Sequence, residues 1–328
     1  MKKRHIVPLL LTSHGFEYCE QSFYSVIENR YETKNHLVLE GKCILGSAYG
    51  WLVLTALTDS DSIIDLDPYD CCLWNPESKE KIQLPRLNDE GQFYNRCVLS
   101  KPPTDPDCFV MFKHYFVNKL SVCRIGDDEF VEATLESLVA ISSLEGEIYG
   151  IVKHGSHYEL VTIHLVGKTV EFKPLINGKC HWVVPEVCRS WVSSHFNYLI
   201  ESPRGAGEFF VVTMTYKLGF FSDYNVEFRV FRLDVNGLVC EELENLDGHT
   251  IFIGVYGDGF CCTSDGMGIK PNSIYYTARH GVVLSVYDLD DRSTTQLLPC
   301  PVVAGRYEGS INYWVNYWVD LPDILRLE

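Results

Sequence analysis

The sequence has no long run of basic residues after Lys2, Lys3 and Arg4. Its 44 acidic side chains outnumber the 28 basic ones, and the formal net charge is −16 at pH 7. A phosphate backbone or an anionic membrane surface would repel such a chain unless its few basic residues gathered on one face. We therefore expect neither nucleic acid nor a membrane among its partners.

Long hydrophobic runs are also missing, since no stretch reaches the ~20 apolar residues of a membrane-spanning helix. The apolar run at residues 6–11 is short, contains Pro8, and is not followed by the small-residue cleavage pattern of a secretory signal. Glu17 and Glu20 argue against a transit peptide in the same region. We expect a protein of the cytoplasm, the nucleus or both.

A disulfide framework is not evident, although the chain has 13 cysteines. An odd number without regular spacing is typical of a reducing compartment, where thiols stay free. Neighbouring residues of a strand point to opposite faces, so the adjacent pairs Cys71–Cys72 and Cys261–Cys262 are poorly placed to share a metal. We expect these thiols to be buried as small hydrophobic side chains. No metal and no cofactor is expected.

Helical periodicity is almost absent, and residues 132–141 are the nearest approach to a helix. Valine, isoleucine, tyrosine and phenylalanine come instead in short runs interrupted by Gly, Asn, Asp and Pro, a pattern typical of strands. A hydrophobic content of 46% is enough for a core, and no linker-like segment divides the chain. The sequence predicts an all-β fold in a single domain, residues 1–328.

Five stretches share one pattern, in which a strand ends in polar turn residues and a second strand follows. They are residues 71–85, 121–135, 161–175, 228–243 and 284–299. We interpret each stretch as a hairpin. In the fourth, Asn236-Gly237 predicts a type I′ turn, because these residues readily adopt positive φ.

A further strand with Gly and aromatic residues precedes several hairpins, at residues 46–54, 146–152, 209–216 and 272–278. Two inner strands followed by a hairpin match the four-stranded blade of a β-propeller. Five hairpins and one unit divided between the two ends predict six blades, with seven as the alternative. Strands expected at residues 22–28, 36–40 and 311–319 would form the divided blade and close the ring.

Four segments have no strand pattern and are expected to be irregular loops: residues 88–106, 180–190, 202–207 and 256–271. Loops of this kind on a repeat scaffold often carry the binding site. Plain solvated connections are the competing interpretation for each of them.

A set of motifs lies at residues 46–54, 73–76 with 83–85, 247–254, and 272–277 leading into 286–289. These motifs resemble the plant F-box-associated β-propeller family, which carries a domain of unknown function and includes the KIB-type proteins of brassinosteroid signalling. The resemblance spans roughly residues 9–322. Family members pair an F-box, which docks the Skp1 adaptor of a ubiquitin ligase, with a propeller that binds a client such as a kinase. The resemblance therefore implies a ubiquitin-ligase substrate-receptor type of role.

The residues before Gly46 depart from this pattern, because they contain strand-like segments rather than the helices of an F-box. We expect no F-box and no direct docking of Skp1. The main hypothesis is a non-catalytic propeller that binds a protein client, as a stand-alone binder, a decoy or a scaffold with another task. Its candidate binding residues are Tyr49, Trp51, Trp182 and His249. For the aromatic ones, packing between blades is the competing interpretation.

The alternative hypothesis is a propeller that binds a small plant metabolite at its channel mouth and acts as an enzyme of specialised metabolism. Its catalytic candidates are His181, His195, His249 and Asp265, which loops could bring together over the channel. No Gly-x-Ser-x-Gly elbow frames a serine, and the pair His154 and His157 lacks the helical spacing of zinc proteases. The sequence therefore favours binding over catalysis.

Overall fold

The computed structural model describes the residues of a closed ring of sheets and their main turns. These are residues 8–14, 20–34, 38–39, 42–56, 70–87, 94–114, 118–155, 157–175, 182–183, 193–203, 207–218, 224–237, 239–254, 259–277, 284–297 and 315–320. They form strands, turns and irregular segments without any helix. No helix that could span a membrane is found in this part of the chain.

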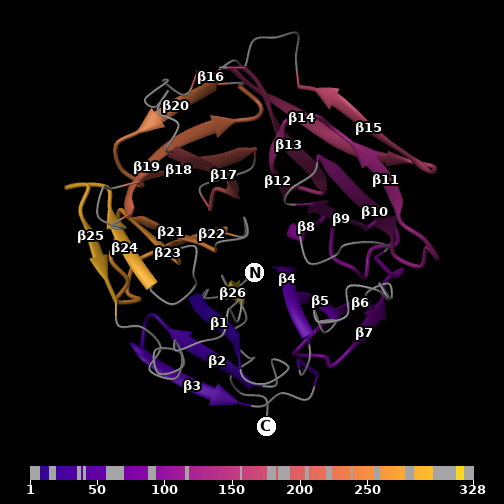
Figure 1. Ribbon diagram of the computed structural model, residues 1–328, viewed down its shortest axis with the longest axis horizontal. Coiled ribbons are helices and arrows are strands. Elements are labelled where there is room, and N and C mark those ends of the chain that lie inside the picture. The colour runs from indigo at the N-terminus through magenta and orange to yellow at the C-terminus, as the bar shows by residue number, and fades with distance from the viewer. Residues whose placement is uncertain are drawn as a thin grey trace.

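Six sheets surround one axis, so the protein is a six-bladed β-propeller (Figure 1). Blades are numbered along the chain, and their strands are given from the axis to the rim. Blade 1 consists of β26 (Val315–Asp320), β1 (Pro8–His14), β2 (Glu20–Ser25) and β3 (Arg30–Lys34). Blade 2 consists of β4 (Lys42–Ala48), β5 (Trp51–Ala56), β6 (Cys71–Trp74) and β7 (Lys81–Gln83).

Blades 3 and 4 repeat this order. Blade 3 consists of β8 (Tyr94–Leu99), β9 (Phe109–His114), β10 (Lys119–Arg124) and β11 (Val131–Thr134). Blade 4 consists of β12 (Leu138–Leu144), β13 (Glu147–His154), β14 (His157–Val166) and β15 (Thr169–Pro174), with β16 (Trp182–Val183) also paired to β14.

Blade 5 consists of β17 (Ser193–Glu201), β18 (Glu208–Leu218), β19 (Tyr224–Asp234) and β20 (Val239–Leu243). Blade 6 departs from this four-stranded pattern by one extra strand. Blade 6 consists of β22 (Gly259–Thr263), β21 (His249–Ile253), β23 (Ser273–Thr277), β24 (Leu284–Asp288) and β25 (Thr294–Gln296). Strands β21 and β23 pair in parallel, whereas the other described pairs are antiparallel.

The ring closes through blade 1, as the sequence predicted. Strand β26 pairs with β1 from Pro8 opposite Asp320 to Ser13 opposite Val315. One of the strands expected for this blade is wrong, because Val38 and Leu39 lie in a turn. Leu39 is buried there between blades 1 and 2, and its carbonyl accepts a hydrogen bond from the Gln21 side chain. The strand was predicted because the segment is apolar. Its Leu39 side chain is indeed buried, but its backbone belongs to a turn and not to a sheet.

The five predicted hairpins are confirmed, from β6–β7 to β24–β25. The weak helix pattern at residues 132–141 is wrong, since β11, a turn and β12 occupy it. Residues 46–54 contain a two-residue turn between β4 and β5 rather than one strand. The type I′ turn at Asn236-Gly237 is also wrong, because neither residue has positive φ. The Asp234 carboxylate instead accepts both of their amide hydrogens, at 2.9 and 3.0 Å.

Two of the segments expected to be irregular contain inner strands. Residues 88–106 include β8, and residues 256–271 include β22. The first begins with polar residues, and the second is preceded by a Gly-rich stretch, so neither shows a clear alternation of apolar and polar side chains. Residues 202–207 do form the connection between β17 and β18 where they are described.

The core consists of six apolar clusters, one at each interface between neighbouring blades. Each contains large side chains that are fully buried, such as Leu52, Phe112, Ile163, Phe209, Phe210 and Phe252. Burying such a side chain stabilises the fold by about 1.5–3 kcal/mol. A single blade could not bury both of its faces, so closure of the ring is what makes this core possible.

The cysteines belong to this core. Cys71 packs at the interface with blade 3 and Cys72 at the interface with blade 1, which confirms that these neighbours face opposite ways. Cys261 and Cys262 divide in the same manner between blades 5 and 1. Eight cysteines with described side chains are free thiols, and seven of these are buried. Burial raises the pKa of the Cys71 thiol well above its ordinary value, so this thiol stays protonated and apolar.

Candidate functional site

Two inner hairpins end in tight turns of the same kind. Tyr49-Gly50 connects β4 to β5, with φ values of 55° and 81°. Glu145-Gly146 connects β12 to β13, with φ values of 52° and 89°. Positive φ at both positions is the geometry of a type I′ turn, which glycine adopts without strain at the second position. Each turn therefore holds its first side chain in a fixed direction.

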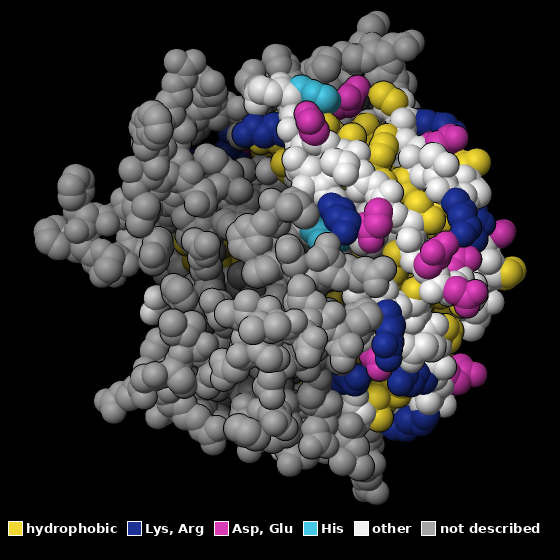
Figure 2. Space-filling model, turned by 45° about the vertical axis from the view of Figure 1, so that its right-hand side comes forward, with side chains coloured by type: hydrophobic (Ala, Val, Ile, Leu, Met, Phe, Trp, Pro, Cys, Tyr) yellow, Lys and Arg dark blue, Asp and Glu magenta, His cyan; other side chains and the backbone are white. Residues whose placement is uncertain are grey.

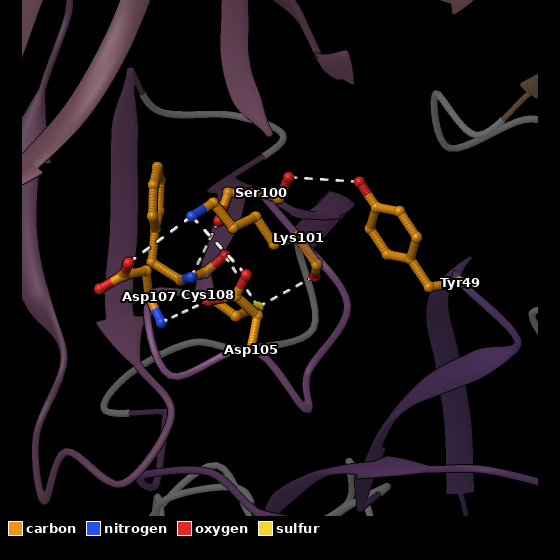
Figure 3. Close-up of polar contacts among 7 residues, drawn as sticks. Tyr49, Ser100, Lys101, Asp105, Asp107 and Cys108 are labelled. Atoms are coloured by element: carbon orange, nitrogen blue, oxygen red, sulfur yellow. Dashed lines mark hydrogen bonds and ion pairs between the residues drawn. The ribbon is translucent and has the colours of Figure 1, made fainter. Parts of the chain in front are cut away.

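The phenol of Tyr49 reaches from its turn to blades 3 and 4. Its hydroxyl donates a hydrogen bond of 3.2 Å to the carbonyl oxygen of Ser100 (Figure 3). A second hydrogen bond joins the phenol to the Ser143 side chain at the end of β12. The side chain nevertheless remains 46% exposed. Tyr49 of blade 2 is thus a solvent-facing aromatic residue whose hydroxyl interacts with blades 3 and 4.

The loop that follows β8 is folded tightly beneath this phenol. Asp105 accepts hydrogen bonds from the amides of Asp107 (2.8 Å) and Cys108 (3.0 Å). The Lys101 ammonium lies 3.7 Å from a carboxylate oxygen of each aspartate (Figure 3). The Lys101 side chain also lies against Gly146, where a Cβ atom would be 3.4 Å from Cε. The loop therefore connects the inner turns of blades 2 and 4.

One carboxylate acts electrostatically on the phenol, and a second carboxylate acts on the first. Glu201, the last residue of β17 in blade 5, has a pKa raised first by burial and then by the charge of Glu145. Burial also raises the pKa of Tyr49, and the charges of Glu201 and Cys108 add to this, whereas the Ser143 hydrogen bond opposes it. The electrostatic effects therefore run from Glu145 to Glu201 and from Glu201 to Tyr49. We name Tyr49, Ser100, Lys101, Ser143, Glu145 and Glu201 the inner-turn cluster.

The inner-turn cluster offers several kinds of group that can contact a ligand. It combines an exposed aromatic ring, hydroxyl groups and two carboxylates. One of these, Glu201, has a raised pKa and keeps its proton to a higher pH than an ordinary glutamate. No group of three metal-ligating side chains occurs among the residues that the structure describes. On the face shown in Figure 2, basic and acidic side chains are interspersed over the described part of the surface.

The predicted binding residues are placed differently from one another. Tyr49 belongs to the inner-turn cluster. Trp51 is only 4% exposed and packs between blades 2 and 3, so packing, the competing interpretation, describes it. His249 begins β21, and its Nδ1 lies 2.8 Å from the carbonyl oxygen of Leu246. The backbone of Trp182 pairs with Tyr158 in blade 4.

The catalytic candidates are not gathered into one site by the contacts described. Asp265 is an exposed turn residue that follows β22, two residues beyond the partner of His249 in the sheet. No direct contact between His249 and Asp265 occurs within the described structure. The backbone of His195 pairs with Thr215 in blade 5. His181 lies outside the described residues.

Sequence reasoning missed most of the inner-turn cluster. Ser100, Ser143, Glu145 and Glu201 carry no recognisable motif in the sequence. One signal was present, because the glycines Gly50 and Gly146 each follow the first strand of a repeat. Aligning the repeats on these glycines would have marked the residue before each of them as a turn tip.

A hollow with a volume of about 530 Å³ lies between blades 5 and 6. It is lined by Phe228, Arg229, Glu242, Glu244, Tyr287 and Arg292, among others. The Arg229 guanidinium binds the Glu242 carboxylate through two nitrogens, and its remaining nitrogen, Nη1, is buried without a partner. This hollow contains none of the predicted site residues.

Comparison with known proteins supports the fold. The family model of the KIB1-4 beta-propeller matches residues 23–295. No curated protein matches the chain. Similar solved structures include a protein from Lactobacillus plantarum, with 8% identity, 96% of this chain and 100% of that chain covered, and a TM-score of 0.38. Another is the α-L-arabinanase of Penicillium chrysogenum complexed with arabinobiose, with 11% identity, 85% of this chain and 92% of that chain covered, and a TM-score of 0.37. A third is the hydrazine synthase of Kuenenia stuttgartiensis, with 11% identity, 92% of this chain and 80% of that chain covered, and a TM-score of 0.36. We draw no functional argument from similarities this low.

Proposed function

Because the chain belongs to the KIB1-4 β-propeller family, we propose that it is a non-catalytic propeller that binds a protein client through the inner-turn cluster. The observation that carries this proposal is Tyr49, an exposed aromatic residue held by hydrogen bonds from two other blades. Aromatic residues dominate the binding energy of protein interfaces, because they bury a large area at a low cost in side-chain entropy.

The charges of the cluster indicate the kind of surface that would bind there. The charge of Glu145 helps to raise the pKa of Glu201, and Lys101 is already paired with Asp105 and Asp107. A basic side chain of a client would lie against the Tyr49 ring and between the two carboxylates, which favours a cation–π contact. We therefore propose that the client presents Lys or Arg at this point.

The family resemblance suggests a protein kinase as the client and the cytoplasm or nucleus as the place of binding. We further propose that binding does not require direct docking of Skp1. Support comes from residues 8–34, where the described residues are strands and turns of blade 1. Co-purification of the chain with Skp1 alone would contradict this part of the proposal.

The small-molecule alternative receives less support from the described side chains. Of the four catalytic candidates, only His249 and Asp265 have described side chains. His249 contacts a backbone carbonyl through Nδ1, and Asp265 is exposed in a turn. A general base needs its reacting partner within hydrogen-bond reach, and no hydrogen bond joins these two residues in the described structure.

The test compares three forms of the protein against one purified client. A client is first identified by affinity capture and mass spectrometry, and its Kd is then measured with wild type, Tyr49→Ala and Val38→Ala. Val38 is a matched control, because it is 43% exposed and lies before β4, at the opposite end of that strand from Tyr49. We expect Tyr49→Ala to weaken binding about 10- to 100-fold and Val38→Ala to leave it unchanged.

Two results would contradict the proposal. The first is equal affinity of wild type and Tyr49→Ala for the client, with both proteins folded. The second is turnover of a small molecule by the purified protein that Tyr49→Ala abolishes.

A further inference from the structure

The outer edge of β19 in blade 5 is only partly covered by β20. Strand β19 pairs with β18 along its whole length, from Tyr224 to Asp234. Strand β20 pairs only with its last part, from Val230 to Asp234. Among the described residues, no strand pairs with the outer side of β19 from Tyr224 to Arg229. An uncovered strand edge is a template on which a further strand can pair.

The register shows which backbone groups point outward from this edge. Val235 follows directly after β19, and its N–H donates a hydrogen bond of 2.8 Å to the carbonyl oxygen of Gly207 beside β18. Backbone direction alternates along a strand, so Val230, Phe228 and Val226 direct their N–H and C=O groups to the opposite, outer side. Val230 meets β20 there, whereas Phe228 and Val226 face no described strand.

The hollow of about 530 Å³ lies at this uncovered edge. Glu227 and Arg229 point to one face of blade 5, and Phe228 and Val230 point to the other, where they pack toward blade 6. All four line the hollow, so it lies beyond the edge of β19 rather than over one face of the sheet. The Tyr287 phenol also lines it and interacts with the backbone amide of Phe228. The hollow therefore has the position of an added strand.

Acidic side chains predominate around the hollow. Its lining contains four carboxylates and two guanidinium groups, and one of the guanidinium groups is already neutralised by the Arg229–Glu242 ion pair. The carboxylates are those of Glu227, Glu242, Glu244 and Asp290. A segment that carries basic side chains is complementary to this lining.

From this geometry we infer that the uncovered edge of β19 binds an extended segment of a partner protein as an added antiparallel strand. Residues directly opposite each other in such a pair have side chains on the same face. Apolar residues of the segment lie opposite Val226 and Phe228, on the face toward blade 6, and a basic residue between them lies opposite Glu227. Backbone hydrogen bonds give affinity in this mode of recognition, and alternate side chains give specificity.

This site is separate from the inner-turn cluster. It lies among outer strands of blades 5 and 6 (Figure 1), whereas the cluster is formed at inner strands and their turns. The inference therefore goes beyond the proposed binding of a client through Tyr49, and either can hold without the other.

The probe is a short synthetic peptide of alternating valine and lysine, labelled with fluorescein and titrated with the purified protein. Fluorescence anisotropy gives the Kd. Two derivatives carry N-methyl groups, one at the valines and the other at the lysines. The valines lie opposite Val226 and Phe228, so their N–H groups point to β19, whereas those of the lysines point away. We expect methylation of the valines to weaken binding more than about 10-fold, and methylation of the lysines to leave it within about 2-fold.

Charge reversal tests the contact with Glu227. Glu227→Lys should weaken binding of the valine–lysine peptide about 5-fold and strengthen binding of a peptide in which glutamate replaces lysine. Glu136→Lys is the matched control, because Glu136 is exposed in the turn between β11 and β12 and the exchange changes the net charge equally. It should bind both peptides as wild type does. The methylated peptides need only wild-type protein, so the test stands even if Glu227→Lys fails to fold.

Four results would overturn the inference. One is failure of the valine–lysine peptide to bind saturably. Another is equal binding of the two methylated peptides, which would mean attraction by net charge alone. The third is an equal effect of Glu227→Lys and Glu136→Lys on binding. The last is self-association of the protein that the peptide reverses, which would assign the edge to a second copy of the chain.

Discussion

The hydroxyl of Tyr49 donates its hydrogen bond to a carbonyl oxygen of a neighbouring blade, that of Ser100, at 3.2 Å. Ser100 is fully buried, so this carbonyl has little access to water. The contact has two effects. It satisfies a buried acceptor, and it fixes the direction of an exposed aromatic ring.

Tyr49→Phe separates these two effects, because it removes the hydroxyl and keeps the ring. We expect the free energy of unfolding to fall by about 1–2 kcal/mol, since a buried carbonyl loses its partner. Urea denaturation followed by tryptophan fluorescence measures this change. An unchanged midpoint would mean that water replaces the phenol at Ser100.

Gly46→Ala tests the close approach of blades 2 and 3 near the axis. A Cβ atom at Gly46 would lie 2.9 Å from the carbonyl oxygen of Cys97 on β8, which is backbone and cannot rotate away. We expect the melting temperature to fall, corresponding to a loss of about 1–3 kcal/mol. Ser47→Ala, at the exposed neighbouring position, should melt like wild type. Equal melting of both variants would show that the inner strands can move apart.

Lys113 is buried on β9, so its charge predicts a dependence on pH. Its pKa is about 8 in the folded protein and 10.5 ordinarily, so the unfolded chain binds more protons between these values and stability rises with pH. The stability advantage of Lys113→Met over wild type should be largest below pH 8. It should shrink by up to about 3 kcal/mol as the pH rises toward 10.5.

Denaturation of both proteins from pH 7 to 10 measures this difference, and the other titrating groups cancel because the two proteins share them. A difference that stays constant over this range would show that the amine is not perturbed in solution.

Truncation tests ring closure. A chain ending at residue 314 lacks β26, which pairs with β1 over six residues. Several backbone hydrogen bonds of about 1 kcal/mol each and the packing of blade 1 would be lost, which is comparable to the whole stability of a domain. We expect loss of the cooperative melting transition. A chain ending at residue 320 keeps β26 and is the control, and equal melting of the two chains would contradict closure by this strand.

Much of the fold could be predicted from the sequence because its hairpins repeat. The turn at residues 75–80 and its counterparts interrupt apolar strands at similar spacing, and the outer strands followed directly. The turn at Asn236-Gly237 could not be predicted from its own residues. Its geometry is decided by the Asp234 carboxylate, which binds two amides and stabilises a longer loop.

The inner-turn cluster was less predictable, because its members come from four blades. Tyr49 and Glu201 are far apart in the sequence and meet only after the blades have packed in a ring. Local patterns fix the hairpins but not how one blade is placed against the next. Tyr49 was nevertheless selected as a binding residue, whereas Trp51, two residues away, is buried.

The pairing of β26 with β1 has a consequence for biosynthesis. About 300 residues separate these strands, and at roughly 5–20 residues per second a ribosome needs about 15–60 s to make them. During this interval one edge of β1 has no partner of its own, and a free strand edge pairs readily with other chains. The nascent protein therefore depends on protection of this edge until the last strand emerges.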